Sequence, residues 1–233
     1  MTLIDPGQGD SATAFARLAV DLHEAGGVEE TVDAVVQFAL QALDCTYAGV
    51  ALSTRGSRAE IAAVTDPVVG DVFELQISSQ RGPLMTALRD RTPVLIRDTA
   101  LDDRWPQWAE KVAALGVRSV FDVPLTTGNP RTWTVGVLGL YSPDPDAFGP
   151  DDEAVAHILA RHASVALATA RNEAALAQAV DARKLVGQAM GILMERFDID
   201  SDRAFAVLRR YSQDTNTKLR DVAQQLIDTR KLP

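Results

Sequence analysis

The segment from Lys184 to Phe197 has the residue types and spacing most suited to binding chemistry. Its apolar side chains recur at helical spacing, so the segment is predicted to be a helix. Gly187 and Gly191 fall inside that helix, where each glycine costs roughly 1 kcal/mol relative to alanine. Two glycines so close together indicate close approach by a ligand or by another helix. Helix mechanics alone favour tight packing between helices.

The charge of the chain is unevenly distributed. The net charge is −9, yet the residues from Arg183 onward hold ten Lys and Arg against seven Asp and Glu. The preceding residues hold thirteen basic and twenty-five acidic side chains. An acidic body with a mildly basic end is the asymmetry expected when only that end meets a polyanion.

The other reactive side chains do not form a catalytic or metal-binding pattern. His157 and His162 are five residues apart, so they diverge on a helix and make a poor metal pair. Cys45 is the single cysteine, and a buried small side chain is the interpretation we favour for it. The acidic loop at residues 98–103 is interpreted as solvated surface. We therefore expect no metal, no cofactor and no enzymatic activity.

Two further short helices must position the C-terminal residues. Asp198 to Asp202 is a polar break, after which a helix is predicted from Asp202 to Gln213, with Asp200 or Ser201 as its cap. Asn216 or Thr217 is predicted to cap a third helix. The periodicity places these side chains inward: Ala204, Phe205, Leu208 and Tyr211 in the second helix, and Leu219, Val222, Ala223, Leu226 and Ile227 in the third.

The N-terminal part alternates helical and strand patterns, which predicts an α+β domain around one antiparallel sheet. Residues 1–10 are expected to be disordered. The predicted helices span 11–25, 28–43, 82–89 and 105–115, and the predicted strands span 46–53, 59–64, 68–77, 93–97, 118–126 and 132–141.

A long helix is predicted to join the two parts, because no proline occurs from Asp151 to Leu232. Within 151–182 it carries a heptad-like seam, which predicts a weak parallel coiled coil between two protomers. The alternative is a single helix packed on its own sheet. The seam consists of Val155, Leu159, His162, Ala166, Thr169, Glu173, Leu176 and Val180.

Three blocks in the tail resemble the ANTAR domain: Gly187-Gln-Ala-Met-Gly-Ile-Leu-Met-Glu-Arg, Ala204-Phe-x-x-Leu-Arg-Arg-Tyr-Ser and Asn216-x-Lys-Leu-x-x-Val-Ala. The resemblance covers about the last 50 residues, assigned as 183–233. It implies an all-α, three-helix, RNA-binding module that acts in transcription antitermination. Many members of that family carry Lys or Arg where this chain has Met190, so one cation of the signature is missing.

The first part resembles a GAF domain, assigned as 1–170. The resemblance rests on Ser119-Val-Phe-Asp-Val-Pro-Leu, Val135-Gly-Val-Leu-Gly-Leu-Tyr and Phe148-Gly-Pro-Asp-Asp. It implies a sensory module that binds a small molecule beside its sheet or serves for dimerisation, without catalysis. Trp105, Trp108 and Tyr141 are candidates to line the pocket of an unknown ligand, or are ordinary core and surface aromatics.

Under the ANTAR resemblance the tail has the parts that RNA recognition requires: cations for phosphates, amides for base edges and small residues for close approach. The predicted partners are RNA hairpin loops and a second copy of the chain. The predicted RNA-binding residues are Lys184, Gln188, Ala189, Gly191, Arg209, Arg210, Asn216, Lys218 and Arg220.

Two other functions remain open from the sequence. Three short helices can also form a DNA-binding helix-turn-helix, and the acidic total with Met190 allows a ligand-sensing or protein-interaction module that binds no nucleic acid. The chain lacks a signal-peptide pattern and any apolar run of about 18 residues. With its single cysteine, this predicts a cytoplasmic protein without a membrane partner.

Overall fold

The computed structural model describes residues 6–54, 58–127 and 134–231, except the side chains of residues 6–12. The chain divides into two compact units, Met1–Arg171 and Asn172–Pro233. One helix, α6 (Pro150–Phe197), is continuous across the boundary, as the proline-free interval predicted.

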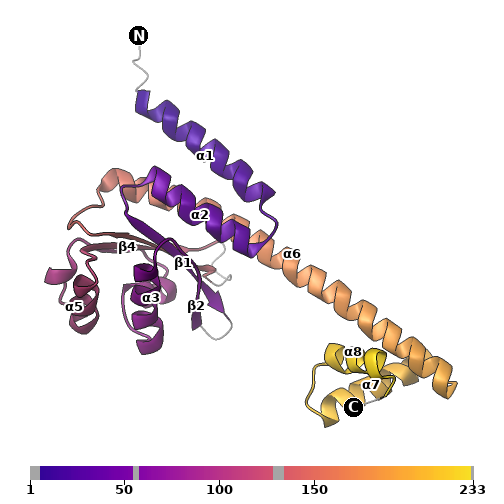
Figure 1. Ribbon diagram of the computed structural model, residues 1–233. Helices are drawn as coiled ribbons and strands as arrows, with labels where there is room; N and C mark the ends of the chain where they lie inside the picture. Colours follow the sequence, from indigo (N-terminus) through magenta and orange to yellow (C-terminus); the bar gives the residue numbers. More distant parts are fainter. Residues whose placement is uncertain (1–5, 55–57, 128–133, 232–233) are drawn as a thin grey trace. The chain divides into compact units, whose positions relative to one another are not determined.

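The described residues of the first unit form one antiparallel sheet of five strands in the order β2-β1-β5-β4-β3 (Figure 1). The central strands β4 and β5 are buried at every position, so helices must cover both faces of the sheet. This confirms the α+β prediction. The strands are β1 (Tyr47–Thr54), β2 (Arg58–Val64), β3 (Val94–Ile96), β4 (Ser119–Leu125) and β5 (Gly136–Ser142).

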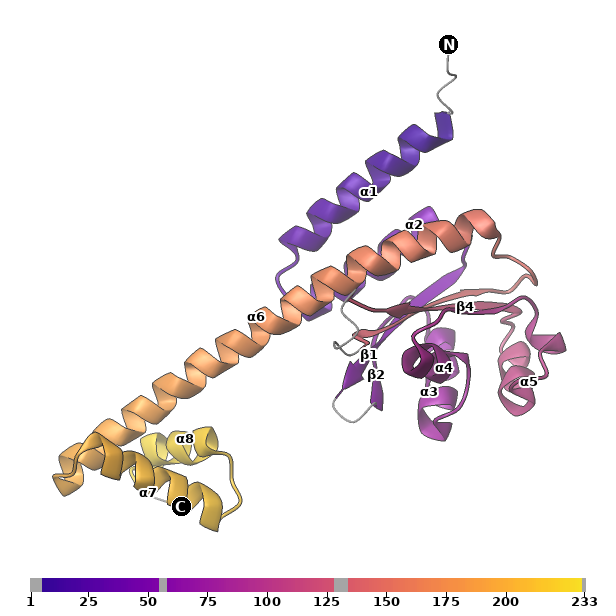
Figure 2. The same ribbon diagram turned by 180° about the vertical axis from the view of Figure 1, so that it is seen from behind.

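The helices form a layer on each face of this sheet (Figures 1 and 2). On one face lie α2 (Val28–Ala42) and the first half of α6, and α1 (Pro6–Glu24) adds the buried Leu18 to the same core. The opposite face is covered by α3 (Pro67–Ser79), α4 (Pro83–Asp90) and α5 (Pro106–Ala114), with a short 3-10 turn η1 (Thr99–Leu101) before α5.

The prediction of a strand at 68–77 is wrong, because this segment is α3. Asp66 caps the helix by accepting a hydrogen bond from the Val68 N–H at 2.9 Å, and Pro67 occupies the first turn. The buried side chains Val69, Val72, Phe73 and Gln76 then follow helical spacing. The cap and this period outweigh the β-branched composition that suggested a strand.

Two other predictions concern segments that lie partly outside the described residues. The stretch 1–10, expected to be disordered, is helical from Pro6, and residues 1–5 lie outside the described residues. The start of the last predicted strand, at 132–133, also lies outside them, and the described strand begins at Gly136.

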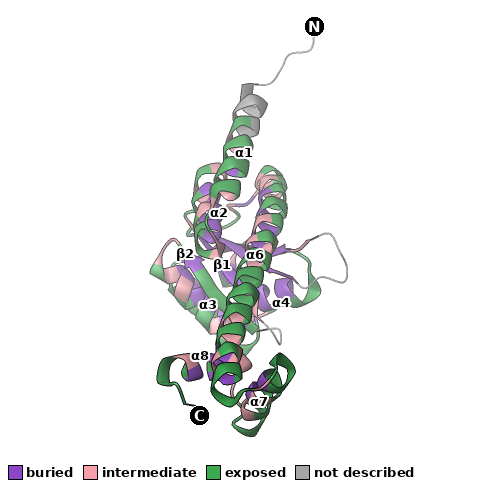
Figure 3. Ribbon diagram, turned by 90° about the vertical axis from the view of Figure 1, so that its right-hand side faces the viewer, coloured by how far each residue is buried: buried purple, intermediate pink, exposed green. Residues whose placement is uncertain are grey.

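Two residues of the predicted seam, Val155 and Leu159, are not available to a second copy of the chain. Leu159 is fully buried in the core over the sheet, and Val155 packs against the same core. The large apolar residues exposed there are Ile158 at 44% and Val165 at 62%. The sheet face needs an apolar cover, so the side of α6 that carries Leu159 packs on its own sheet. Figure 3 shows exposed residues on α6 beside the buried ones.

A carboxyl group lies in the core of the first unit. Asp122 on β4 is fully buried, and its Oδ1 is 3.4 Å from Tyr141 Oη. Burial raises the pKa of Asp122 to about 8, because desolvation disfavours the charged form. Gly139 pairs with Asp122 across the sheet, and a Cβ at Gly139 would overlap Tyr141 Oη. Glycine there leaves room for the Asp122–Tyr141 pair.

The second unit consists of the end of α6, α7 (Ser201–Asp214) and α8 (Leu219–Thr229). Three helices therefore form this unit, as predicted. Within the described ranges, none of the helices combines the length and apolar content needed to cross a membrane.

Candidate nucleic-acid interface

A small core fixes the three helices of the second unit. Each helix contributes short or branched apolar side chains that are fully buried. They are Ala189 and Leu193 from α6, Ala204 and Leu208 from α7, and Val222, Ala223 and Leu226 from α8.

The ends of α7 and α8 are built differently. Asp200 caps α7 by accepting a hydrogen bond from the Arg203 N–H at 2.8 Å, as one of the two predicted caps. The predicted caps of α8 are wrong, because Lys218 is at the N-cap and provides no side-chain bond. Asn216 instead makes the turn, with φ 51°, in the left-handed region that asparagine tolerates. Its side chain is left at the surface.

Eight of the nine residues predicted to bind RNA are exposed, and Ala189 is the exception. Ala189 is fully buried in the three-helix core, so its assignment as a binding residue is wrong. Its small side chain packs with apolar side chains of α7 and α8 in that core. A residue two positions from Gly187 and Gly191 lies about 200° around the helix, on the opposite face.

Gly187 and Gly191 lie on the open surface of α6. A Cβ built at either position meets no described atom within 4 Å. Packing among the three helices therefore does not explain these glycines. Because they are four residues apart, they share one face of α6, and no side chain on that strip blocks approach by another molecule.

The cations differ in how they are paired. Arg209 and Lys218 form no ion pair with any described residue. Both are exposed, so their charges are available to phosphates. The other three predicted cations have exposed partners on their own helices, and such pairs are weak. They are Lys184 with Asp181 at 3.7 Å, Arg210 with Asp214 at 3.5 Å and Arg220 with Asp221 at 3.1 Å.

Exposed aromatic side chains were missed as candidates. Phe205, predicted to point inward, is 39% exposed, and Phe197 at the end of α6 is 56% exposed. Phe205 follows the buried Ala204 by one position, which turns its side chain about 100° from the core direction. This one-residue offset from Ala204 was the feature of the sequence that could have predicted an exposed Phe205. An exposed phenyl ring is a surface on which an unpaired base can stack.

The three aromatic candidates of the first unit have different environments. Tyr141 is fully buried, with its ring centroid 6.0 Å from that of Phe73. Trp108 is 7% exposed and belongs to the same core. Trp105 is half-buried, and together with Trp108 it lines a cavity outside the sheet. Among the described residues, no cluster of His, Cys, Asp and Glu is arranged to hold a metal ion.

Comparison with known families agrees with this two-part organisation. Residues 25–168 match the model of the GAF domain, and residues 174–227 match that of the ANTAR domain. The chain belongs to the GAF domain family. Its C-terminal part is an ANTAR domain, so both resemblances are confirmed. GAF–ANTAR proteins are regulators, and neither domain is a catalytic one. No curated protein sequence matches the chain.

Solved structures share the fold of the GAF part. The GAF domain of a phosphoenolpyruvate-protein phosphotransferase from Coxiella burnetii is 15% identical, with a TM-score of 0.55, covering 71% of this chain and 96% of that one. The corresponding Acinetobacter domain is 14% identical, with a TM-score of 0.54 and coverage of 70% and 96%. Free methionine-R-sulfoxide reductase from Neisseria meningitidis is 15% identical, with a TM-score of 0.55 and coverage of 74% and 97%. At these identities the likeness concerns the fold alone.

Proposed function

We propose that this GAF–ANTAR protein is an RNA-binding regulator of transcription antitermination, which binds hairpin loops in nascent leader transcripts through residues 183–233. The observation that carries the proposal is the surface of the ANTAR unit. It combines two unpaired cations, Arg209 and Lys218, with two glycines whose α6 face is open. A bound hairpin would prevent the competing terminator from forming, so transcription would continue.

Each exposed residue has a role suited to a looped RNA. Arg209 and Lys218 contact phosphates, while Gln188 and Asn216 offer amides for base edges. Gly191 allows the RNA backbone near α6. Lys184, Arg210 and Arg220 exchange their weak intrahelical partners for phosphates. Met190, half-buried where many relatives carry a cation, is not part of this surface.

The GAF part, 1–170, senses a small molecule or holds two copies of the chain together. Exposed apolar residues on the linking segment 151–182, Leu176 at 67% and Val180 at 44%, support a homodimer through α6. Two ANTAR domains in one dimer bind two hairpins with a higher effective affinity than either alone. The protein acts in the cytoplasm, where nascent transcripts are found.

The decisive experiment is a mobility-shift titration of the whole chain with a leader RNA that contains two hairpins. Arg209→Ala combined with Lys218→Ala should weaken binding at least tenfold, because two phosphate contacts are lost. The salt dependence of log K should fall in slope by roughly 1.4, since each contact to single-stranded nucleic acid contributes about 0.7. The matched control, Arg17→Ala with Arg58→Ala, removes two exposed cations of the GAF part and should change neither value.

The same titration separates the other functions. Duplex DNA bound as tightly as the hairpins would favour a helix-turn-helix regulator of DNA. Binding to neither nucleic acid, at low and at moderate salt, would leave a sensory or protein-interaction module. Unchanged affinity of the double variant for RNA would contradict the proposed surface.

A further inference from the structure

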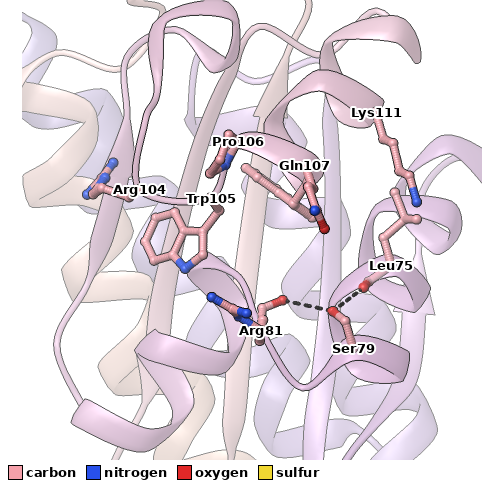
Figure 4. Close-up of a pocket in the computed structure, with 9 residues that line it drawn as sticks. Leu75, Ser79, Arg81, Arg104, Trp105, Pro106, Gln107 and Lys111 are labelled. Atoms are coloured by element: carbon pink, nitrogen blue, oxygen red, sulfur yellow. Dashed lines mark hydrogen bonds between the residues drawn. The ribbon is translucent and has the colours of Figure 1, made fainter.

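A cavity in the GAF unit lies between the end of α3 and the start of α5, away from the sheet (Figure 4). Its volume is about 250 Å³. Drug-sized ligands occupy pockets of roughly 300 to 1,000 Å³, so this cavity suits a smaller molecule. No strand residue lines it. The lining residues are Leu75, Ser79, Arg81, Arg104, Trp105, Pro106, Gln107, Trp108 and Lys111.

The charge of the lining has one sign. Three of the lining residues are cations and none is a carboxylate. Arg104 is neutralised by Asp102, which accepts from its Nε at 2.9 Å. Arg81 and Lys111 form no ion pair with any described residue. Lys111 also lines an adjoining hollow, and the lining of that hollow includes the carboxylates Asp71 and Glu74. Arg81 is therefore the main uncompensated charge.

Hydrogen-bond donors converge on the same space. Figure 4 shows the indole nitrogen of Trp105 and the guanidinium group of Arg81 directed toward each other, although both can only donate. Trp108, which also lines the cavity, is 7% exposed, and its Nε1 has no partner among the described residues. An acceptor between Arg81 and Trp105 would satisfy both, and an anionic acceptor would also compensate the charge of Arg81.

Part of the remaining wall is apolar. The Trp105 indole, Leu75 and Pro106 provide carbon surface around the donors, and the Arg104 guanidinium lies over the Trp105 ring, 4.8 Å from its centroid. A fully hydrated ion such as sulfate would leave that surface against water. A ring that carries a carboxylate would cover the apolar wall and direct its oxygens at Arg81.

We propose that this cavity binds a small aromatic carboxylate, with the carboxylate on Arg81 and the Trp105 Nε1–H and the ring beside the Trp105 indole. The inference rests on the sensory role proposed for the GAF part and is independent of RNA binding by the ANTAR part. It gives the unknown ligand a chemical class and a location between α3 and α5.

Benzoate is the probe, and the three tryptophan indole N–H signals of the ¹⁵N-labelled whole chain are the measurement. Benzoate should shift the Trp105 signal saturably, and Trp105→Phe assigns that signal by removing it. A ligand of this size is expected to bind with a Kd between roughly 10 µM and 1 mM. Arg81→Gln should raise the Kd at least tenfold, while the control Arg58→Gln, an exposed arginine on β2, should leave it unchanged.

Three comparisons make the result decisive. Benzamide keeps the ring but lacks the charge, cyclohexanecarboxylate keeps the charge but lacks the aromatic face, and sulfate keeps only the charge. Each should bind more weakly than benzoate. The proposal is overturned if benzoate gives no saturable shift up to about 10 mM, ten times the weakest expected Kd. It is also overturned if benzamide, cyclohexanecarboxylate or sulfate binds as tightly as benzoate, or if Arg81→Gln binds benzoate like the wild type.

These outcomes are separable from the RNA hypothesis. The indole signals come from tryptophans that precede Arg171, so they report the GAF unit even when no RNA binds. A protein that binds benzoate but no hairpin would retain the sensory assignment and lose the antitermination role. A protein that binds the hairpin but not benzoate would retain the antitermination role. Its GAF unit would then bind its ligand elsewhere or would serve for dimerisation.

Discussion

The buried carboxyl of Asp122 should make the stability of the GAF unit depend on pH. Its pKa is raised from 3.8 to about 8 in the folded protein, whereas in the unfolded chain it returns to about 3.9. Between these values the folded state keeps a proton that the unfolded state releases. The stabilisation is therefore complete below about pH 4 and is lost as the pH rises toward 8.

The magnitude follows from the difference in pKa. Each pKa unit corresponds to 1.36 kcal/mol, so the difference of about four gives about 5 kcal/mol over the whole range. Between pH 5 and pH 8 the free energy of unfolding should fall by about 3 to 4 kcal/mol from this group. In Asp122→Asn, which cannot ionise, this part of the pH dependence should disappear.

Urea unfolding followed by tryptophan fluorescence measures this. All three tryptophans precede Arg171, so the signal reports the GAF unit alone. The wild type and Asp122→Asn should differ in the slope of stability against pH, and Asp103→Asn, at an exposed carboxylate, should keep the wild-type slope. Parallel curves for the wild type and Asp122→Asn would refute a neutral buried carboxyl.

Three further changes test the ANTAR unit. Gly191→Ala should stabilise α6 by roughly 0.5–1 kcal/mol, because the added methyl meets open space. The same methyl should weaken hairpin binding by blocking the approach of RNA to α6. Thermal melting measures the first effect and a mobility shift the second, and unchanged RNA affinity would remove Gly191 from the interface. Leu208→Ala should cost about 2 to 5 kcal/mol in the small core, seen by circular dichroism as early melting of the C-terminal helices. Asp200→Ala should cost about 1 kcal/mol by loss of the α7 cap, measured by thermal melting; Asp202→Ala, two residues further on in the first turn and without a cap bond, should cost less.

Local signals in the sequence determined much of this protein. The proline-free interval after Pro150 predicted α6, and the periodicity around Leu208 and Leu226 predicted the three-helix unit. These features depend on the spacing of apolar residues and on caps, which neighbouring residues set without distant contacts. The order of motifs likewise identified both families. Cations and amides chosen from the tail were exposed, because polar side chains have little reason to be buried.

Tertiary contacts decided the remaining features, since burial depends on what packs against each helix. In the first unit α6 carries apolar residues on the side of Leu159 and on the side of Val165. Only packing on the sheet determined that Leu159 is buried while Val165 is exposed. Ala189 and Gly191 look alike as small residues, yet the position of α7 and α8 puts one in the core and the other at the surface. The cavity at Arg81 and Trp105 joins residues from α3 and the start of α5, which are separated in sequence by α4 and β3. The sequence pattern of a single segment cannot predict this cavity, because the cavity forms only when the two helices pack on the sheet.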